Sequence, residues 1–107
     1  MTETIIVFCT CGSQKEASHV AKELVEKRLA ACVNIIPTMQ SVYRWEDRVE
    51  EASEHLLLIK STAKLFERLR KSIVELHSYE VPEIIAVPVA EGTEPYLCWV
   101  KESVLPR

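Results

Sequence analysis

The sequence predicts an α+β fold in which two helices pack on one face of an antiparallel β-sheet. Strand-like and helix-like hydrophobic periods alternate in the order β-α-β-β-α-β. Two prolines fall in the strands that this order places at the sheet edges. The 107 residues fit one domain, residues 1–107. A chain of this size holds one hydrophobic core, so its function resides in one site or one surface.

The first third of the chain predicts a strand and a helix. Residues 4–10 are rich in β-branched and apolar side chains, and they end before Gly12, where glycine permits a turn. Ser13 followed by Glu16 forms a capping box, and apolar residues then recur at helical spacing. We therefore predict a helix over residues 13–29.

The middle of the chain predicts a long β-hairpin. Residues 31–45 and 49–60 favour strands, and Asp47 lies in the turn between them, since aspartate tolerates left-handed backbone. The first strand would reach about 50 Å if extended, whereas the radius of gyration of such a domain is about 13 Å. The hairpin must bend or project. A projecting arm that carries Tyr43 and Trp45 needs another chain to cover these aromatics, so we expect an oligomer.

The last third predicts a helix, a strand and a terminal segment. Residues 63–77 place apolar side chains on one helical face, and residues 84–89 form a short apolar strand. Residues 95–104 are compatible with either a short helix or a strand. Trp99 in this segment is expected at a subunit interface, because large aromatics dominate subunit contacts.

This order of elements is the ferredoxin-like split βαβ arrangement, whose second and fourth strands are the sheet edges. Pro37 and Pro88 fall in these two strands and in neither central one. Proline cannot donate a hydrogen bond to a neighbouring strand, so its positions support the topology independently of the periodicity.

Charge and cysteine usage argue against several classes of partner. The formal net charge is −3 with both signs interspersed, so no basic stripe is available for nucleic acid. The first eight residues lack a basic region, and their apolar run is far shorter than the ~20 residues that span a bilayer. The four cysteines lie in or beside apolar stretches. We expect a cytoplasmic protein without nucleic-acid or membrane partners.

The sharpest chemical feature is the segment Cys9-Thr10-Cys11. Residues i and i+2 of a strand point the same way, so two thiolates can reach one soft ion such as Cu(I). The alternative is that Cys9 is a small core residue and Cys11 a turn residue. His77, at the end of the second predicted helix, either joins them as a ligand or caps a carbonyl. The candidate metal ligands are Cys9, Cys11 and His77, and no metal is required for folding.

A second candidate site lies between the second helix and the last strand. Tyr79, Glu80 and Glu83 can line a small-molecule cleft between protomers, because loops held by rigid elements often carry function. Alternatively, Tyr79 anchors the loop and Glu83 pairs with a basic neighbour. Catalysis is not expected, because Cys9 and His77 are accompanied by no Gly-x-Ser-x-Gly, His-Glu-x-x-His or P-loop motif.

Four segments of the chain form a recognisable series: RLAACVNIIP from residue 28, SVYRW from 41, HSYEVPEI from 77 and YLCW from 96. Together they resemble the CutA family of divalent-cation tolerance proteins. The resemblance implies a ferredoxin-like protomer, a tight trimer built by edge-strand pairing, and an association with copper and other divalent metals. In copper-binding members a cysteine that ends the first strand and a histidine pair are implicated. Cys9 and His77 match these positions, and Leu76 replaces the first histidine.

The sequence therefore predicts a trimeric, non-catalytic protein that binds copper or other soft divalent metal ions and requires no cofactor. Tyr43, Trp45 and Trp99 are its expected interface residues. The alternative is a trimeric signalling or scaffold protein that binds a small ligand or another protein at the inter-subunit cleft, with Tyr79 and Glu83 in that cleft. Fold analogy alone supports this alternative.

Overall fold

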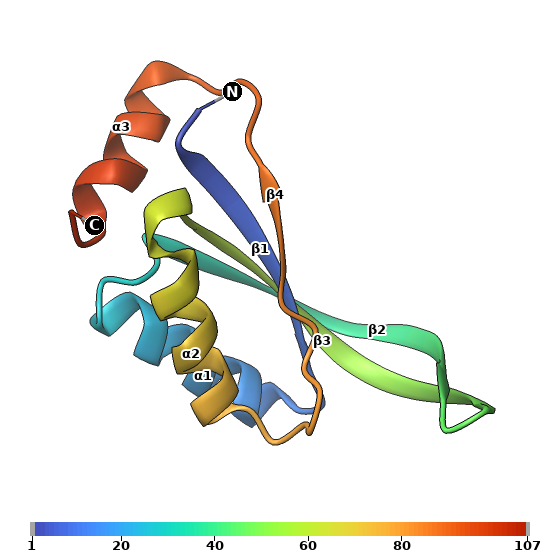
Figure 1. The fold of residues 1–107 in the computed structure, drawn as a ribbon. Coiled ribbons are helices and arrows are strands. Elements are labelled where there is room, and N and C mark those ends of the chain that lie inside the picture. The colour runs from blue at the N-terminus through green and yellow to red at the C-terminus, as the bar shows by residue number, and fades with distance from the viewer. Residues whose placement is uncertain (1, 107) are drawn as a thin grey trace.

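The computed structural model describes residues 2–106 as an α+β fold with one four-stranded sheet and three α-helices (Figure 1). Met1 and Arg107, the ends of the predicted domain, lie outside the described residues. The strands are β1 Thr4–Cys11, β2 Cys32–Trp45, β3 Arg48–Thr62 and β4 Ile85–Pro88. The helices are α1 Gln14–Glu26, α2 Phe66–Leu76 and α3 Glu94–Ser103, and a 3₁₀-helix, Ala63–Leu65, precedes α2. Each predicted element is present, with ends that differ by a few residues.

The sheet has the strand order β2-β3-β1-β4, and all neighbouring strands are antiparallel. β2 and β4 are therefore the edges, as the positions of Pro37 and Pro88 predicted. Pro37 lies in a register shift between Ile36 and Met39, where Thr38 adopts the left-handed φ of 46°. This bulge bends β2 where it leaves the body of the molecule.

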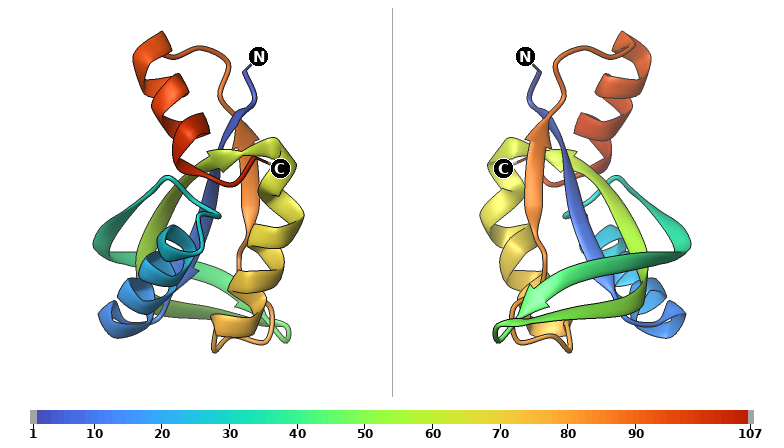
Figure 2. Two further views of the ribbon diagram at one scale, coloured as in Figure 1. Left: turned by 90° about the vertical axis from the view of Figure 1, so that its left-hand side faces the viewer. Right: turned by 90° about the vertical axis from the view of Figure 1, so that its right-hand side faces the viewer.

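Helices α1 and α2 cover one face of the sheet, and the core lies between them and the strands (Figures 1 and 2). Alternate residues of β1 and β3 point into this core, as a half-buried strand requires. The fully buried members from the two strands are Val7, Cys9, Cys11, Leu57 and Ile59, and those from the helical layer are Ala17, Val20, Leu24, Leu65, Leu69 and Ile73.

The start of α1 is capped as predicted, with one change of partner. The Ser13 hydroxyl accepts a hydrogen bond from the Glu16 N–H at 3.1 Å, which is half of a capping box. The Glu16 carboxylate instead accepts the N–H of Ser78 at 2.7 Å. Glu16 therefore ties the start of α1 to the residues that follow α2, next to His77.

The outer halves of β2 and β3 form an arm that projects from the body, so the chain measures 44 × 25 × 22 Å (Figure 1). Glu46 and Asp47 connect the paired residues Trp45 and Arg48, with φ angles of 50° and 64°. Positive φ at both central residues is the type I′ geometry, whose twist matches that of the strands. The predicted turn and the predicted projection are both confirmed.

The terminal segment, which the sequence left as helix or strand, is helix α3. It begins after Thr93 and carries Pro95 in its first turn, where a missing N–H costs nothing. The chain then returns to the body, where the Leu105 N–H donates to the Arg28 carbonyl at 2.9 Å. Within residues 2–106, each helix falls short of the length and apolar character needed to cross a bilayer.

Candidate functional site

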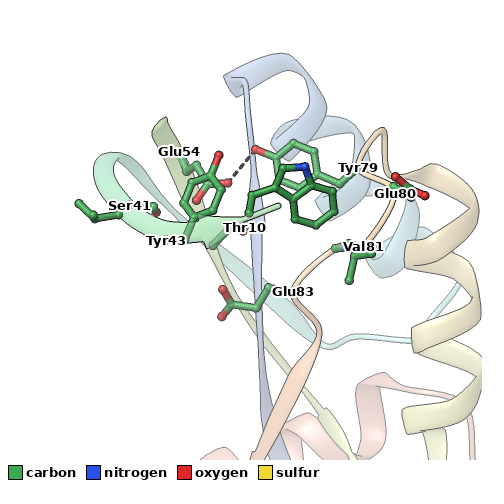
Figure 3. A pocket seen from close by; sticks show the side chains of 11 residues that line it. Thr10, Ser41, Tyr43, Glu54, Tyr79, Glu80, Val81 and Glu83 are labelled. Atoms are coloured by element: carbon green, nitrogen blue, oxygen red, sulfur yellow. Dashed lines mark hydrogen bonds between the residues drawn. The ribbon is translucent and has the colours of Figure 1, made fainter. Parts of the chain in front are cut away.

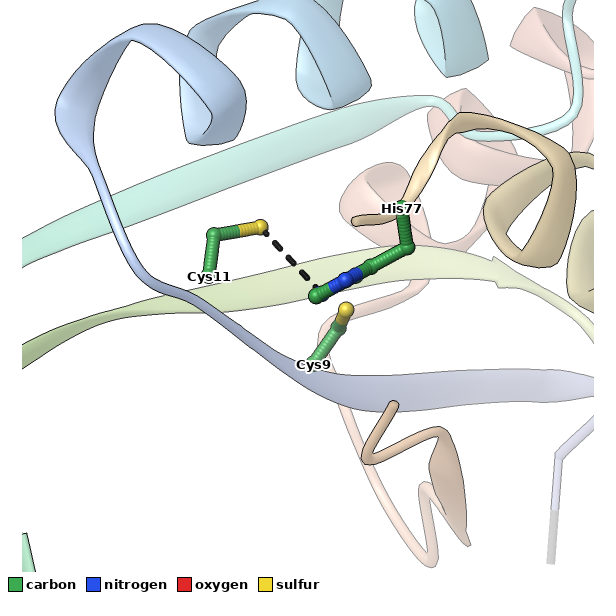
Figure 4. Close-up of side chains that lie close together, drawn as sticks. All are labelled: Cys9, Cys11 and His77. Carbon is green, nitrogen blue, oxygen red and sulfur yellow. Dashed lines mark hydrogen bonds between the residues drawn. The ribbon is translucent and has the colours of Figure 1, made fainter. Parts of the chain in front are cut away.

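Two cysteines and a histidine meet at the end of β1 (Figure 4). Cys9 and Cys11 lie two residues apart on the strand, so both point into the core, where both are fully buried. His77 directly follows α2 and is 9% exposed. The two sulfur atoms and a ring nitrogen all lie within 4.8 Å of one another. The structure thus brings together the three residues that were predicted as metal ligands.

Both ring nitrogens of His77 already have hydrogen-bond partners. Nε2 lies 2.7 Å from the Thr10 carbonyl oxygen, which can only accept, so Nε2 carries the proton. Nδ1 then accepts the Tyr79 N–H at 3.1 Å. His77 therefore joins β1 to the loop after α2. It does bind a carbonyl, as the alternative prediction held, but the carbonyl belongs to β1 and not to the helix.

The two thiols differ in acidity because each affects the ionisation of the other. The hydrogen bond with Cys11, together with burial, raises the pKa of Cys9 far above its ordinary value. The same hydrogen bond from Cys9 lowers the pKa of Cys11, although burial opposes this. Cys11 Sγ also lies 3.8 Å from Nε2 of His77. Cys11 is therefore the first of the pair to become a thiolate.

The donor set fits a soft metal ion. Thiolate and imidazole are the ligands that copper and zinc prefer, with bonds of about 2.0–2.3 Å, so two ligand atoms of one ion lie at most ~4.6 Å apart. The observed limit of 4.8 Å is close to this value. Ligation by Nε2 of His77 requires that the ring release the Thr10 carbonyl and its proton, whereas the thiols need only ionise. The remaining cysteines, Cys32 and Cys98, lie outside the cluster, and Cys98 is exposed.

A cleft of about 680 Å³ lies between the projecting arm and residues 79–83 (Figure 3). It contains both predicted cleft residues, Tyr79 and Glu83, and two predicted interface residues, Tyr43 and Trp45. The sequence placed this cleft between protomers, whereas a single chain already forms it. Its full lining is Thr10, Ser41, Val42, Tyr43, Trp45, Glu54, Tyr79, Glu80, Val81, Pro82 and Glu83.

Trp99, the third predicted interface residue, lies away from this cleft. It is on α3, where its ring packs against Tyr96 with centroids 5.6 Å apart. Trp99 instead borders a second groove with Val25 and Ala30 at the end of α1. The structure thus separates the predicted interface aromatics into two groups.

Glu54 is a site residue that the sequence interpretation missed. It lies on β3, is only 7% exposed, and accepts a 2.7 Å hydrogen bond from the Tyr79 hydroxyl (Figure 3). Burial, and next the hydrogen bond to Glu54, raise the pKa of Tyr79. A signal was present, because Glu54 falls in the same strand alternation as Leu56 and Leu58.

Gly12 makes room for Tyr79 at the end of β1. A Cβ atom on Gly12 would lie 3.1 Å from the Tyr79 hydroxyl oxygen, closer than ordinary van der Waals contact. The sequence predicted Gly12 as a turn residue. The structure adds that its missing side chain allows Tyr79 to reach Glu54.

Comparison with known proteins gives one consistent family. Residues 5–103 match the family model described as CutA1 divalent ion tolerance protein. The divalent-cation tolerance protein CutA of Thermus thermophilus is 49% identical over 98 residues, which cover 92% of this chain and 95% of that protein. Human protein CutA is 47% identical over 95 residues, which cover 89% of this chain but 53% of the human protein. The chain thus spans about half the length of the human relative.

Solved structures of the same family share the fold. The structure of the Thermus thermophilus divalent cation tolerance protein has a TM-score of 0.93 at 48% identity, covering 94% of this chain and 98% of that one. CutA1 from Oryza sativa has a TM-score of 0.95 at 38% identity, covering 97% of this chain and 95% of that one.

Proposed function

Because the chain belongs to the CutA1 divalent ion tolerance family, we propose that it is a non-catalytic protein that binds copper or another soft metal ion. The observation that carries this proposal is the cluster of Cys9, Cys11 and His77, whose ligand atoms lie within 4.8 Å. Two thiolates on one strand face supply the soft donors, and His77 is the third ligand. The helices and strands already give the chain a hydrophobic core, so we expect that metal is not needed for folding.

We further propose that the chain has the ferredoxin-like topology and works as a homotrimer. The strand order β2-β3-β1-β4 supports the topology. The projecting arm, with its exposed Tyr43 and Trp45, supports association through the arm and the edge strands. We place the protein in the cytoplasm, because thiolate ligands persist in a reducing compartment.

A second candidate function is binding of a small ligand in the cleft beside the arm. It is supported by the volume of about 680 Å³, which falls within the range of small-molecule sites. In this role the trimer is a signalling or scaffold protein, and Tyr79 and Glu83 contact the ligand. The two candidates use different residues, so they can be tested separately.

Competition titration against a Cu(I) chelator under reducing conditions tests the metal proposal. We expect tight binding by the wild type and at least ~10-fold weaker binding by Cys9→Ser, Cys11→Ser and His77→Ala, since each removes one ligand. Cys98→Ser is the matched control, because it removes an exposed thiol outside the cluster. Circular dichroism of each variant checks folding. Equal affinity in the wild type and all three cluster variants would disprove a specific site here.

A further inference from the structure

We propose that the cleft between the arm and residues 79–83 binds an organic cation, a substituted ammonium ion with an apolar body. This inference rests on the second candidate function and names its ligand class. It uses different residues from the metal cluster, because none of Cys9, Cys11 and His77 lines the cleft.

The walls of the cleft are aromatic. Tyr43 and Trp45, which are also the proposed interface residues of the arm, come from β2, and Tyr79 comes from the loop after α2. Figure 3 shows Tyr43 and Tyr79 on two sides of the cleft, with Glu83 from the segment before β4 near them. Aromatic faces attract cations within about 6 Å of the ring centre, and such rings are how proteins recognise alkylated ammonium groups.

The charged groups of the cleft are all acidic. Among residues 2–106, three carboxylates line it, those of Glu54, Glu80 and Glu83, and no lysine, arginine or histidine does. A ligand with a net negative charge would meet only repulsion, whereas a cation gains three attractive partners. The acidic lining therefore favours a positively charged ligand, and the aromatic walls favour a ligand with an apolar body.

Glu54 is the observation that points most directly to a bound cation. Its side chain is more than nine-tenths buried, and among residues 2–106 it takes part in none of the ion pairs. The Tyr79 hydroxyl donates to one of its oxygens. A buried carboxylate without a counter-charge is costly, and an ammonium group in the cleft would supply that charge.

An inorganic divalent cation fits this cleft less well. Calcium takes six to eight oxygen ligands, and magnesium retains most of its water, so both need a cage of oxygens. Here Glu80 and Glu83 are exposed, and much of the wall consists of rings and the aliphatic side chains of Val42, Val81 and Pro82. A ligand that buries apolar surface gains more from these walls than a hydrated ion does.

Isothermal titration calorimetry with choline tests the inference, with 3,3-dimethylbutan-1-ol as an uncharged probe of the same shape. We expect one choline per chain, bound at least ~10-fold more tightly than the alcohol. Glu83→Gln and Glu54→Gln should each weaken choline binding at least ~3-fold and leave alcohol binding unchanged. Glu91→Gln is the matched control, because it removes the same charge from an exposed residue outside the cleft. Light scattering verifies that all variants keep one oligomeric mass.

Three results would overturn the inference. These are equal affinity for choline and the alcohol, no choline binding by the wild type, or displacement of choline by magnesium at lower concentration than by tetramethylammonium. Cys11→Ser separates this inference from the metal proposal, since it should lose Cu(I) affinity and keep choline binding. If both Cys11→Ser and the wild type bind choline but neither binds copper, the metal proposal fails and the cation site stands.

Discussion

His77 illustrates how far residue-level reasoning from the sequence can reach. Strand alternation predicted that Cys9 and Cys11 share a face, and the family resemblance suggested His77 as a third ligand, with a carbonyl cap as the alternative. Neither pattern could reveal that its ring already bonds the Thr10 carbonyl and the Tyr79 N–H. Such bonds depend on how β1 and the loop after α2 meet, which is a property of tertiary structure.

Glu54 is the opposite case, because the sequence placed it in a strand but gave no strong reason to assign it to a site. Acids on exposed strand faces are common, so an acid in a strand carries little weight by itself. Tyr79, which is 25 residues away in sequence, packs over Gly12 and donates a hydrogen bond to Glu54. Strand alternation does not reveal this long-range contact.

The Tyr79–Glu54 pair gives a prediction about pH. Because the folded-state pKa of Tyr79 is raised, its proton stays on in the folded protein above pH ~10, where an unfolded tyrosine ionises. The unfolded state then binds fewer protons, so stability should fall as the pH rises above ~10. Tyr79→Phe should remove this part of the fall and one late step of tyrosinate absorbance in the ultraviolet.

Glu54→Gln is the matched control for this titration. It keeps Tyr79 and an acceptor for its hydroxyl but removes the neighbouring charge, so the late step should move to lower pH without disappearing. If Tyr79→Phe shows the same late steps as the wild type, the raised pKa belongs to another tyrosine, and the hydrogen bond to Glu54 does not hold in solution.

At the scale of elements, local signals predicted the fold well. The capping residue Ser13, the helical periods and the edge prolines each act within a few residues, so they can be recognised in the sequence. The type of the terminal segment stayed open, because its apolar residues fit both periods. Thr93 and Pro95, a cap residue and a first-turn proline, are signals that favour the observed helix.

The turn of the arm gives an element-level prediction. Glu46 and Asp47 both have positive φ, which costs non-glycine residues about 1–2 kcal/mol each, with aspartate the more tolerant. Asp47→Gly should therefore stabilise the arm by about 0.5–1 kcal/mol, and Asp47→Val should destabilise it by about 1–2 kcal/mol. Denaturant unfolding at fixed protein concentration measures both, with Asp47→Asn as an intermediate. Equal stability of the glycine and valine variants would contradict the type I′ turn.

At the scale of the whole molecule, half of the exposed large apolar side chains among residues 2–106 lie on the arm and the edge strand β4. Val42 and Val49 on the arm are 62% and 65% exposed, and Ile85 on β4 is 56% exposed. A soluble monomer rarely leaves so many large apolar side chains on unpaired strands. The sequence predicted the projection from length alone, but which strand meets which across subunits depends on surfaces that no periodicity describes.

The last prediction concerns the oligomer that this surface implies. Light scattering over a dilution series should give the mass of a trimer down to micromolar concentration, because isolated arms leave strand edges and aromatics in water. Trp45→Ala should dissociate at higher concentration than the wild type, since truncation of a buried interface tryptophan typically costs at least ~2 kcal/mol. Val74→Ala is the control, because Val74 is exposed to a similar extent, 48% against 43%, but lies on α2 away from the arm. A wild-type monomer that is stable at all dilutions would contradict both the trimer and the role of the arm. In that case Tyr43 and Trp45 would line the cleft and form no subunit interface.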